Sequence, residues 1–244
     1  MVLEEFKVLG IKVNRVSMAQ SLQFLEEAFS APGLTRVITL NAEIAYGACR
    51  KPEQVQLINS ADLVTPDGTG ILWAGQQYGV EIEERVCGID LLTALLERYR
   101  DGSRGFYFLG AKPEIIEAAV ENIAKKYPDL KICGYHDGYF GKENSAAMAA
   151  EIKSSGAEIL IAGMGAPFQE QWIADYGADC GVKIGIGVGG SFDVISGKVN
   201  RAPEFFIKHR LEWLYRFAKE PSRYKRIAVL PKFMAAVKKD IRKS

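Results

Sequence analysis

Polar side chains follow three apolar segments that have the length and composition of buried strands. These side chains are Thr39 and Asn41 after the first segment, Asp67 within Thr65-Pro66-Asp67-Gly68 after the second, and Gln169 within the run Gly163–Trp172 after the third. Because ligands of parallel sheets bind at the carboxyl ends of strands, three polar strand ends facing one crevice would form a site. In such a site the carboxylate of Asp67 is the candidate general base.

Each of these residues also has an ordinary structural interpretation. Asp67 fits the N-cap of a helix over Ile71–Tyr78, and Thr39 with Asn41 fits a turn. Gln169 fits the first turn of a helix that begins at Pro167. The sequence leaves both interpretations open.

A glycine motif with the spacing G-x-G-x-x-G lies at Gly185, Gly187 and Gly190. The dinucleotide-binding fingerprint should close a first strand and open a βαβ unit, whereas this motif closes the last predicted strand and a basic tail follows it. We therefore expect either a close approach of the backbone to a ligand diphosphate or plain close packing.

The elements that would position these residues alternate between short apolar runs and helical patterns. The predicted strands are Phe6–Val13, Arg36–Leu40, Asp62–Val64, Gly105–Leu109, Leu130–Gly134, Glu158–Ala162 and Val182–Val188. Helical periodicity marks Ser17–Phe29, Ile89–Arg100, Pro113–Lys126 and Ser145–Ser154. This alternation predicts an α/β fold, a Rossmann-like and mostly parallel sheet with helices on both faces.

Composition narrows the class of protein. The chain has 244 residues, 48% of them hydrophobic, so it can bury a full core. No apolar run reaches the length of a spanning helix, and Met1–Gly10 does not have the pattern of a signal peptide. The four cysteines and two histidines are not spaced for a zinc site or a disulfide framework, which favours the reducing cytoplasm.

Charge divides the chain into two parts. Residues 195–244 hold 14 Lys and Arg against four acidic residues, while residues 1–194 hold 17 against 26. We predict a catalytic α/β domain over 1–194 and a basic, amphipathic, helical appendage over 195–244. Apolar residues recur at helical spacing in the appendage at Ile207, Leu211, Leu214 and Ala218, and again at Phe233, Val237 and Ile241. That pattern predicts helices lying on an anionic membrane surface, and the alternative is that the apolar stripe packs on the body.

Several longer motifs resemble one family. They are Thr39-x-Asn41, Thr65-Pro66-Asp67-Gly68, Gly163-Met164-Gly165-Ala166-Pro167-x-Gln169-Glu170, Gly187-x-Gly189-Gly190-x-Phe192-Asp193, Arg201-Ala202-Pro203, Leu211-Glu212-Trp213-Leu214-x-Arg216 and Glu220-Pro221-x-Arg223. In this order they resemble the WecG/TagA/CpsF glycosyltransferases, from about Gly10 to Arg226. One departure is Phe205–Phe206, where members of the family often carry Trp after Arg-Ala-Pro.

The resemblance implies an enzyme that transfers a sugar from a nucleotide donor to a lipid-linked acceptor at the inner face of the bacterial membrane. Its TagA branch moves N-acetylmannosamine from UDP-N-acetylmannosamine to undecaprenyl-diphosphate-linked N-acetylglucosamine, in wall teichoic acid synthesis. Relatives use N-acetylmannosaminuronic acid or glucose, so the donor sugar stays open. The expected location is cytoplasmic and peripheral on the membrane, and a soluble homo-oligomer is expected to bury the tail away from it.

The resemblance also assigns roles to residues. Asp67 and Thr39 would be catalytic, and the residues that bind donor or acceptor would be Asn41, Arg85, Gln169, Gly110, Tyr139, Asp193, Arg216, Arg223 and Arg226. Gly110, Tyr139 and Asp193 are equally compatible with a turn glycine, a half-buried core ring and a loop cap.

No Asp-x-Asp triplet, the usual metal-holding motif of nucleotide-sugar transferases, occurs in the chain. We therefore expect a metal-independent inverting enzyme without a cofactor, in which arginines and backbone N–H groups stabilise the departing diphosphate. Two other classes are a Rossmann-type oxidoreductase, which would bind NAD(P), and a nucleic-acid-binding protein, which would use the basic tail. We expect neither nicotinamide nor nucleic acid to bind.

Overall fold

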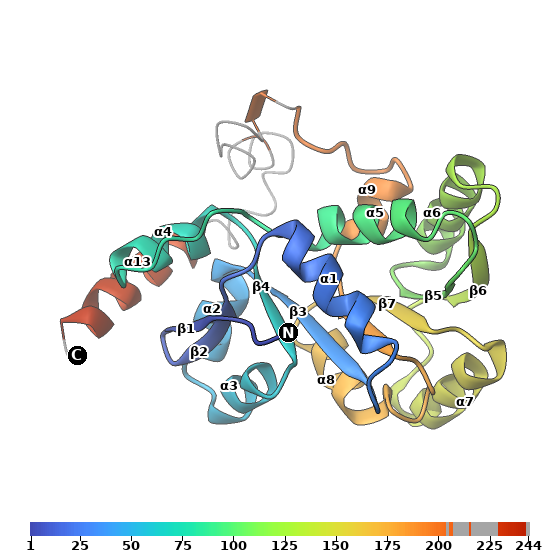
Figure 1. The fold of residues 1–244 in the computed structure, drawn as a ribbon, viewed down its shortest axis with the longest axis horizontal. Helices are drawn as coiled ribbons and strands as arrows, with labels where there is room; N and C mark the ends of the chain where they lie inside the picture. The colour runs from blue at the N-terminus through green and yellow to red at the C-terminus, as the bar shows by residue number, and fades with distance from the viewer. Residues whose placement is uncertain (204, 207–214, 216–228, 243–244) are drawn as a thin grey trace.

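The computed structural model describes residues 1–203, 205–206, 215 and 229–242, and its centre is a six-stranded sheet (Figure 1). The strands run in the order β4 (Leu63–Pro66), β3 (Thr35–Leu40), β8 (Ile184–Gly187), β7 (Ile159–Gly163), β5 (Gly105–Gly110) and β6 (Lys131–His136). Every neighbouring pair is parallel. All residues of β4, β5, β7 and β8 are buried, as expected for strands covered on both faces. The predicted fold class is confirmed.

The first predicted strand, Phe6–Val13, is wrong. The structure has a hairpin there, with β1 (Glu5–Val8) antiparallel to β2 (Ile11–Asn14). Leu9 and Gly10 form the turn, with φ of 53° and 78°. Two successive residues at positive φ match the turn that reverses a twisted hairpin, and Gly10 adopts that conformation without steric cost. Apolar residues alternate with lysine on both sides of the turn, at Phe6 and Val8 and again at Ile11 and Val13, and the prediction of one strand overlooked the change of phase between the two runs.

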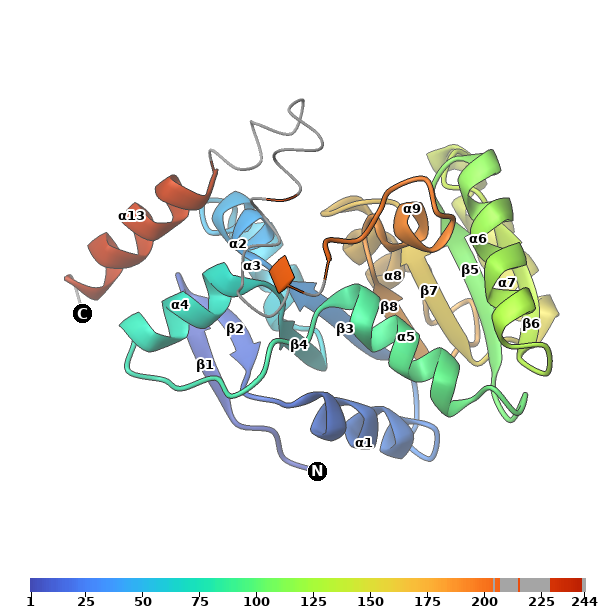
Figure 2. The ribbon, with the colours of Figure 1, turned by 90° about the horizontal axis from the view of Figure 1, so that it is seen from above.

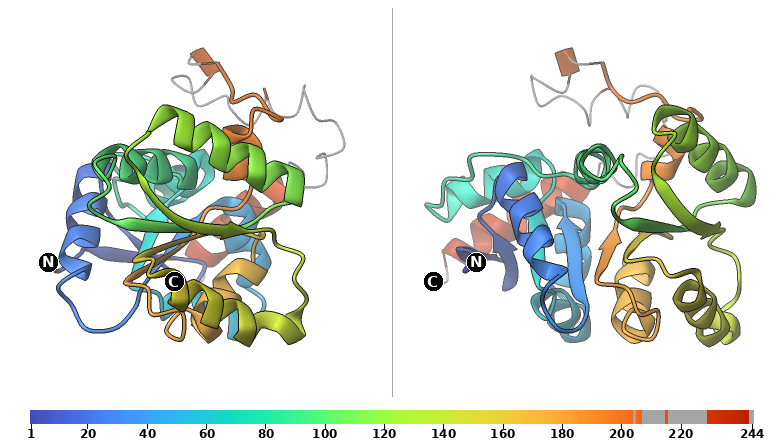
Figure 3. Two further views of the ribbon diagram at one scale, coloured as in Figure 1. Left: turned by 90° about the vertical axis from the view of Figure 1, so that its right-hand side faces the viewer. Right: turned by 45° about the vertical axis from the view of Figure 1, so that its right-hand side comes forward.

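Helices cover both faces of the sheet (Figure 3). One face holds α1 (Met18–Ala28), α5 (Gly88–Arg98), α6 (Pro113–Lys126) and α9 (Ser191–Ile195). The other holds α2 (Ala42–Ala48), α3 (Pro52–Asn59), α7 (Ser145–Ser155), which follows the 3₁₀ turn η1 (Lys142–Asn144), and α8 (Phe168–Tyr176). The helix α4 (Thr69–Gln77) lies at the β4 side (Figure 2). The four predicted helices correspond to α1, α5, α6 and α7.

Two of the three hydrophobic cores of the described residues lie on opposite faces of β5 and follow from the spacing of apolar residues. In α5, Leu91, Leu92 and Leu95 recur at helical spacing, and all three are fully buried against the sheet together with Phe106 and Phe108 of β5. The side chains of alternate positions on the same strand, such as Leu109, reach the core beneath α7 and α8. These layers hold the strand ends rigidly in register.

The helix α13 (Val229–Ile241) packs on the body through its apolar stripe. Phe233 and Val237 are fully buried against α2 and α4, within the same core as β1 and β2. Lys238 and Lys239 are exposed on the outer surface of the helix. For this helix the structure follows the alternative of packing on the body, so its basic face and not its apolar stripe is available to a membrane. The first predicted stripe, Ile207, Leu211, Leu214 and Ala218, lies outside the described residues.

Candidate active site

The carboxyl ends of β3 and β4 bring Asn41 and Asp67 together. Thr39 pairs with Thr65 in the sheet, and the Asp67 N–H donates a hydrogen bond to the Leu40 carbonyl at 2.8 Å. Asn41 is the N-cap of α2, and its side chain accepts from the Ile44 N–H at 3.0 Å. Both side chains are half-buried at one edge of the sheet, as the sequence predicts.

The interpretation of Asp67 as a helix cap is wrong. The N-cap of α4 is Gly68, which has φ of 86° and supplies no side chain. Only glycine adopts this conformation easily, so Gly68 turns the chain away from the sheet and leaves the Asp67 carboxylate outside the helix. Burial raises the pKa of the nearby Cys87 thiol, and the negative charge of Asp67 raises it further.

Thr39 links two strands below this edge. Its side chain is buried, and its hydroxyl donates to the Gly187 carbonyl of β8 at 3.2 Å. The start of α5 approaches closely from the other side, since a Cβ on Gly88 would lie 3.2 Å from Thr39 Oγ1 and 3.4 Å from Val188 Cα. The geometry gives Thr39 a bonding role within the protein in addition to its predicted catalytic one.

The loop that carries Arg85 is tied to the end of β4. The Thr65 hydroxyl donates to the Val86 carbonyl at 2.9 Å, and the Val86 N–H donates to the Pro66 carbonyl at 3.0 Å. These bonds hold Arg85 at the same edge as Asp67. Arg85 therefore joins the residues that the sequence places in the site.

Asp90 contacts Arg85 and two further side chains, and the sequence analysis did not identify it as a site residue. Its carboxylate lies 3.8 Å from the Arg85 guanidinium, accepts from the Cys87 thiol at 2.8 Å and forms an ion pair with Arg201. The Nε atom of Arg201 is buried and has no hydrogen-bond partner within the part of the chain that is described. Arg201 belongs to the Arg-Ala-Pro motif, so the motif carried a signal, whereas Asp90 sits in an ordinary helix pattern and had none.

Gln169 fastens two loops. Its Oε1 accepts from the backbone N–H of Gly165 at 3.0 Å and of Gly189 at 3.1 Å, and its Nε2 donates to Glu170 at 2.7 Å. Gln169 and Glu170 are both buried, and burial raises the pKa of the Glu170 carboxyl. Gln169 thus lies in the first turn of a helix, as the ordinary interpretation has it, and its amide positions the loops after β7 and β8.

The glycine motif at the end of β8 is used for close packing at two of its three positions. A Cβ on Gly185 would lie 2.7 Å from Ile173 Cγ2, and one on Gly187 would lie 2.6 Å from Gln169 Nε2. The strand is central in the sheet, and the helix that follows, α9, has only five residues. This context differs from the dinucleotide fingerprint.

The weaker candidates lie further along the same edge. Gly110 ends β5 with φ of 130°, and a Cβ there would come within 2.5 Å of the Gly163 backbone, so the position requires glycine. Tyr139 is 70% exposed, which rules out the core interpretation of its ring. Asp193 lies in α9, where its carboxylate would be 3.2 Å from a Cβ on Gly190. Arg216, Arg223 and Arg226 lie outside the described residues.

Within the described ranges no three His, Cys, Asp or Glu side chains converge as metal ligands. In the same part of the chain, no helix combines the length and the apolar character that crossing a membrane requires.

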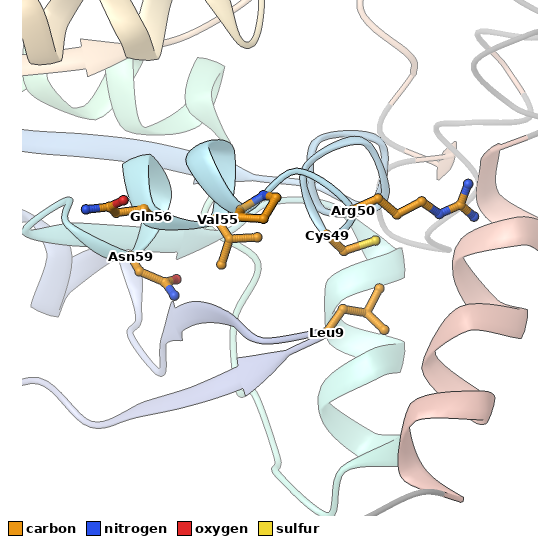
Figure 4. A pocket seen from close by; sticks show the side chains of 7 residues that line it. Leu9, Cys49, Arg50, Val55, Gln56 and Asn59 are labelled. Carbon is orange, nitrogen blue, oxygen red and sulfur yellow. The ribbon is translucent and has the colours of Figure 1, made fainter.

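A hollow of about 600 Å³ lies away from these residues (Figure 4). It lies at the carboxyl end of α2, whereas Asn41 caps the amino end. Leu9, Cys49 and Val55 give it an apolar wall, and Arg50, Gln56 and Asn59 give it polar groups. None of the predicted site residues lines it. The candidate active site is therefore the strand-end edge, and this hollow is a separate feature.

Comparison with known proteins gives a consistent result over most of the chain. The model of the glycosyl transferase WecG/TagA/CpsF family matches residues 6–244. Proteins named N-acetylglucosaminyldiphosphoundecaprenol N-acetyl-beta-D-mannosaminyltransferase are similar to the chain. The one from Bacillus spizizenii is 35% identical over 85% of this chain and 80% of its own length. The Bacillus subtilis protein is 32% identical over 92% and 87%, and the Staphylococcus aureus MW2 protein is 30% identical over 97% and 93%.

Proposed function

Because the chain belongs to the glycosyl transferase WecG/TagA/CpsF family, we propose that it transfers N-acetylmannosamine from UDP-N-acetylmannosamine to undecaprenyl-diphosphate-linked N-acetylglucosamine. Three relatives carry the name of this activity, and the match to this chain covers at least 80% of the length of each. The product would serve as the linkage unit of wall teichoic acid. The observation that carries the proposal is the half-buried Asp67 carboxylate beside Asn41 and Arg85 at one strand-end edge.

We propose a single displacement at this edge. The Asp67 carboxylate takes the proton of the acceptor hydroxyl, whose oxygen attacks C1 of the donor sugar. The bond from C1 to the diphosphate oxygen breaks, and UDP leaves with the electron pair. Because the acceptor oxygen enters from the face opposite the diphosphate, C1 is inverted. Arg85 stabilises the negative charge on the diphosphate, and Gln169 positions the loops after β7 and β8 by accepting from the N–H groups of Gly165 and Gly189. In the proposal Thr39 and Asn41 line the donor sugar, and Gly110, Tyr139 and Asp193 the nucleotide.

Turnover with a panel of donors tests the substrate assignment. We expect the purified protein to transfer sugar from UDP-N-acetylmannosamine to a short-chain prenyl-diphosphate-N-acetylglucosamine, and not from UDP-glucose or the UDP-linked uronic acid. Product formed only with UDP-glucose would contradict the donor assignment. Stabilisation of the fold by UDP, with none by NAD(P) or by duplex DNA, would exclude the oxidoreductase and nucleic-acid classes.

We predict that transfer needs no divalent cation. Arginines supply the positive charge that a metal ion provides in other transferases, since the chain contains no Asp-x-Asp triplet. The initial rate should be the same in excess EDTA as in buffer with Mg²⁺. A rate that EDTA abolishes and Mg²⁺ or Mn²⁺ restores would refute this prediction.

Asp90→Asn should lower kcat about 10- to 100-fold while UDP affinity stays within a few fold, because the loss of the carboxylate charge lets Arg85 and Arg201 move from their places. Asp90 acts through these arginines as a positioning residue. The matched control is Glu158→Gln, which breaks an ion pair of similar exposure with Arg104 at the amino end of β7. Both variants should lose similar stability, and a kcat that falls equally in both would show that Asp90 is only structural.

We also propose that the protein works as a peripheral protein on the anionic inner face of the membrane, where its lipid-linked acceptor resides. The basic appendage supports this, with 14 Lys and Arg against four acidic residues over 195–244. Arg216, Arg223 and Arg226 would reach the diphosphate from the appendage. Away from the membrane, a homo-oligomer would cover apolar side chains of the appendage such as the exposed Phe205.

A further inference from the structure

Three cationic side chains from two separate helices surround a second hollow of about 450 Å³. Arg50 follows the end of α2, while Lys232 and Lys239 come from α13. The two lysines are seven residues apart and therefore share one side of the helix. Between them Ala235 and Ala236 leave the space that forms the hollow.

The walls of this hollow are held in place by buried contacts. Phe233, next to Lys232, and Val237, two residues before Lys239, are fully buried on the body. Near the other end of α13, the Tyr78 hydroxyl donates to the Asp240 carboxylate at 2.6 Å. Burial and this hydrogen bond raise the pKa of Tyr78 to about 12, so the hydroxyl stays a donor at neutral pH.

The charge of the lining is positive. Among the described residues that line the hollow, Asp240 is the one acidic residue, and the Tyr78 hydroxyl donates to one of its oxygens. The Arg50 guanidinium lies over the Tyr46 ring, 4.6 Å from its centroid, and donates to the Tyr46 hydroxyl. Figure 4 shows Arg50 extending from the end of α2 toward α13. Three cations around one hollow match a phosphate group.

The hollow continues into the larger one described above, because Leu9 and Arg50 line both. The larger hollow adds the apolar side chains of Pro52 and Val55 next to the cationic part. A ligand that fits this pair of hollows combines a phosphate with an apolar body.

We propose that the α2–α13 hollow binds the phosphate of an anionic phospholipid headgroup. The choice of a membrane lipid rests on the proposed function, in which the enzyme acts on a lipid-linked acceptor. The site lies near the catalytic edge: a Cβ on Gly70, three residues after Asp67, would be 3.2 Å from Leu230 Cδ1 at the start of α13. The helix α2 has seven residues and is about 10 Å long; Asn41 caps its amino end and Arg50 follows its carboxyl end. A headgroup held there would place the strand-end edge beside the membrane surface.

Vesicle binding by two variants of equal charge tests the site. Lys232→Gln with Lys239→Gln removes two cations from the hollow. Lys238→Gln with Arg242→Gln removes two exposed cations outside it, one on α13 and one directly after the helix. A diffuse basic face predicts equal losses of affinity for vesicles of 30% phosphatidylglycerol in phosphatidylcholine. The defined site predicts a loss at least about tenfold larger for the first variant, since it removes direct phosphate contacts in addition to the general attraction. Equal losses would overturn the proposal.

A second measurement identifies the source of the phosphate. A short-chain, soluble phosphatidylglycerol below its micelle concentration should raise the Tm of the unaltered protein and of the control variant but not of the hollow variant. Stabilisation by inorganic phosphate at the same concentration would show that a free anion and not a lipid is the ligand. Neither measurement contains a sugar substrate, so a failure here is separate from a failure of the proposed transfer reaction, which the soluble acceptor assay reports.

Discussion

Asp67→Asn should lower kcat by about 10² to 10⁴, the usual effect of removing a general base. The amide has the shape of the carboxylate but cannot take the proton of the acceptor hydroxyl. The fold should be retained, because the hydrogen bond that fixes this position to Leu40 comes from the Asp67 backbone N–H. The measurement is single-turnover transfer with saturating UDP-N-acetylmannosamine, together with UDP binding by thermal shift.

Asp62→Asn is the matched control for this variant. Asp62 precedes β4, at the amino end of the strand that Asp67 follows, and its carboxylate accepts from the Arg36 N–H at 2.8 Å, a bond that the asparagine amide oxygen can also accept. Turnover of Asp62→Asn should equal that of the unaltered protein. A rate for Asp67→Asn within threefold of this control would remove Asp67 from the mechanism.

Phe233→Ala should reduce the free energy of unfolding by about 3 to 5 kcal/mol, the cost of emptying the place of a fully buried aromatic ring. For a domain of this size that loss corresponds to a fall in Tm of roughly 6 to 20 °C. The reason is that Phe233 belongs to the core shared by α13, α2, α4 and the β1–β2 hairpin. Chemical denaturation followed by circular dichroism measures it.

Lys238→Ala, an exposed position on the same helix, is the control and should change stability by less than about 0.5 kcal/mol. A Phe233→Ala protein as stable as this control would mean that α13 does not dock on the body in solution.

The buried stripe of α13 also affects how the predicted boundary between residues 1–194 and 195–244 can be tested. Deleting residues 195–244 removes Phe233 and Val237 from the core, so such a truncation tests folding as well as membrane binding, and point variants separate the two.

The sequence by itself determined the α/β class and the strand-end edge at which the candidate site lies. Apolar runs such as Gly105–Leu109 lie in strands because their residues are buried on both faces, and this leaves a continuous apolar pattern in the sequence. Thr39, Asn41 and Asp67 could be predicted at one edge because parallel strands all end there. The family could be predicted because its motifs preserve residue order and spacing.

Only the tertiary structure decided how the side chains pair. Sequence patterns record local periodicity, whereas Asp90 meets Arg201 across 111 residues and Gln169 meets Gly189 across 20. The hairpin differs from these pairs, because the alternation of apolar residues changes phase between Val8 and Ile11 and so marks the place of the break. That the chain reverses there, at Leu9 and Gly10, depends on backbone dihedral angles that the pattern does not carry.

The stripe of α13 shows the limit most directly. Phe233 and Val237 at helical spacing predict an apolar face, but an amphipathic pattern is the same whether the face meets a membrane or a protein core. Burial against α2 and α4 assigned it to the core and turned Lys232 and Lys239 toward Arg50. When a helix buries one face against the body, its opposite face is exposed to solvent. The residues that contact each face of α13 lie far away in the sequence, so a local pattern cannot identify them.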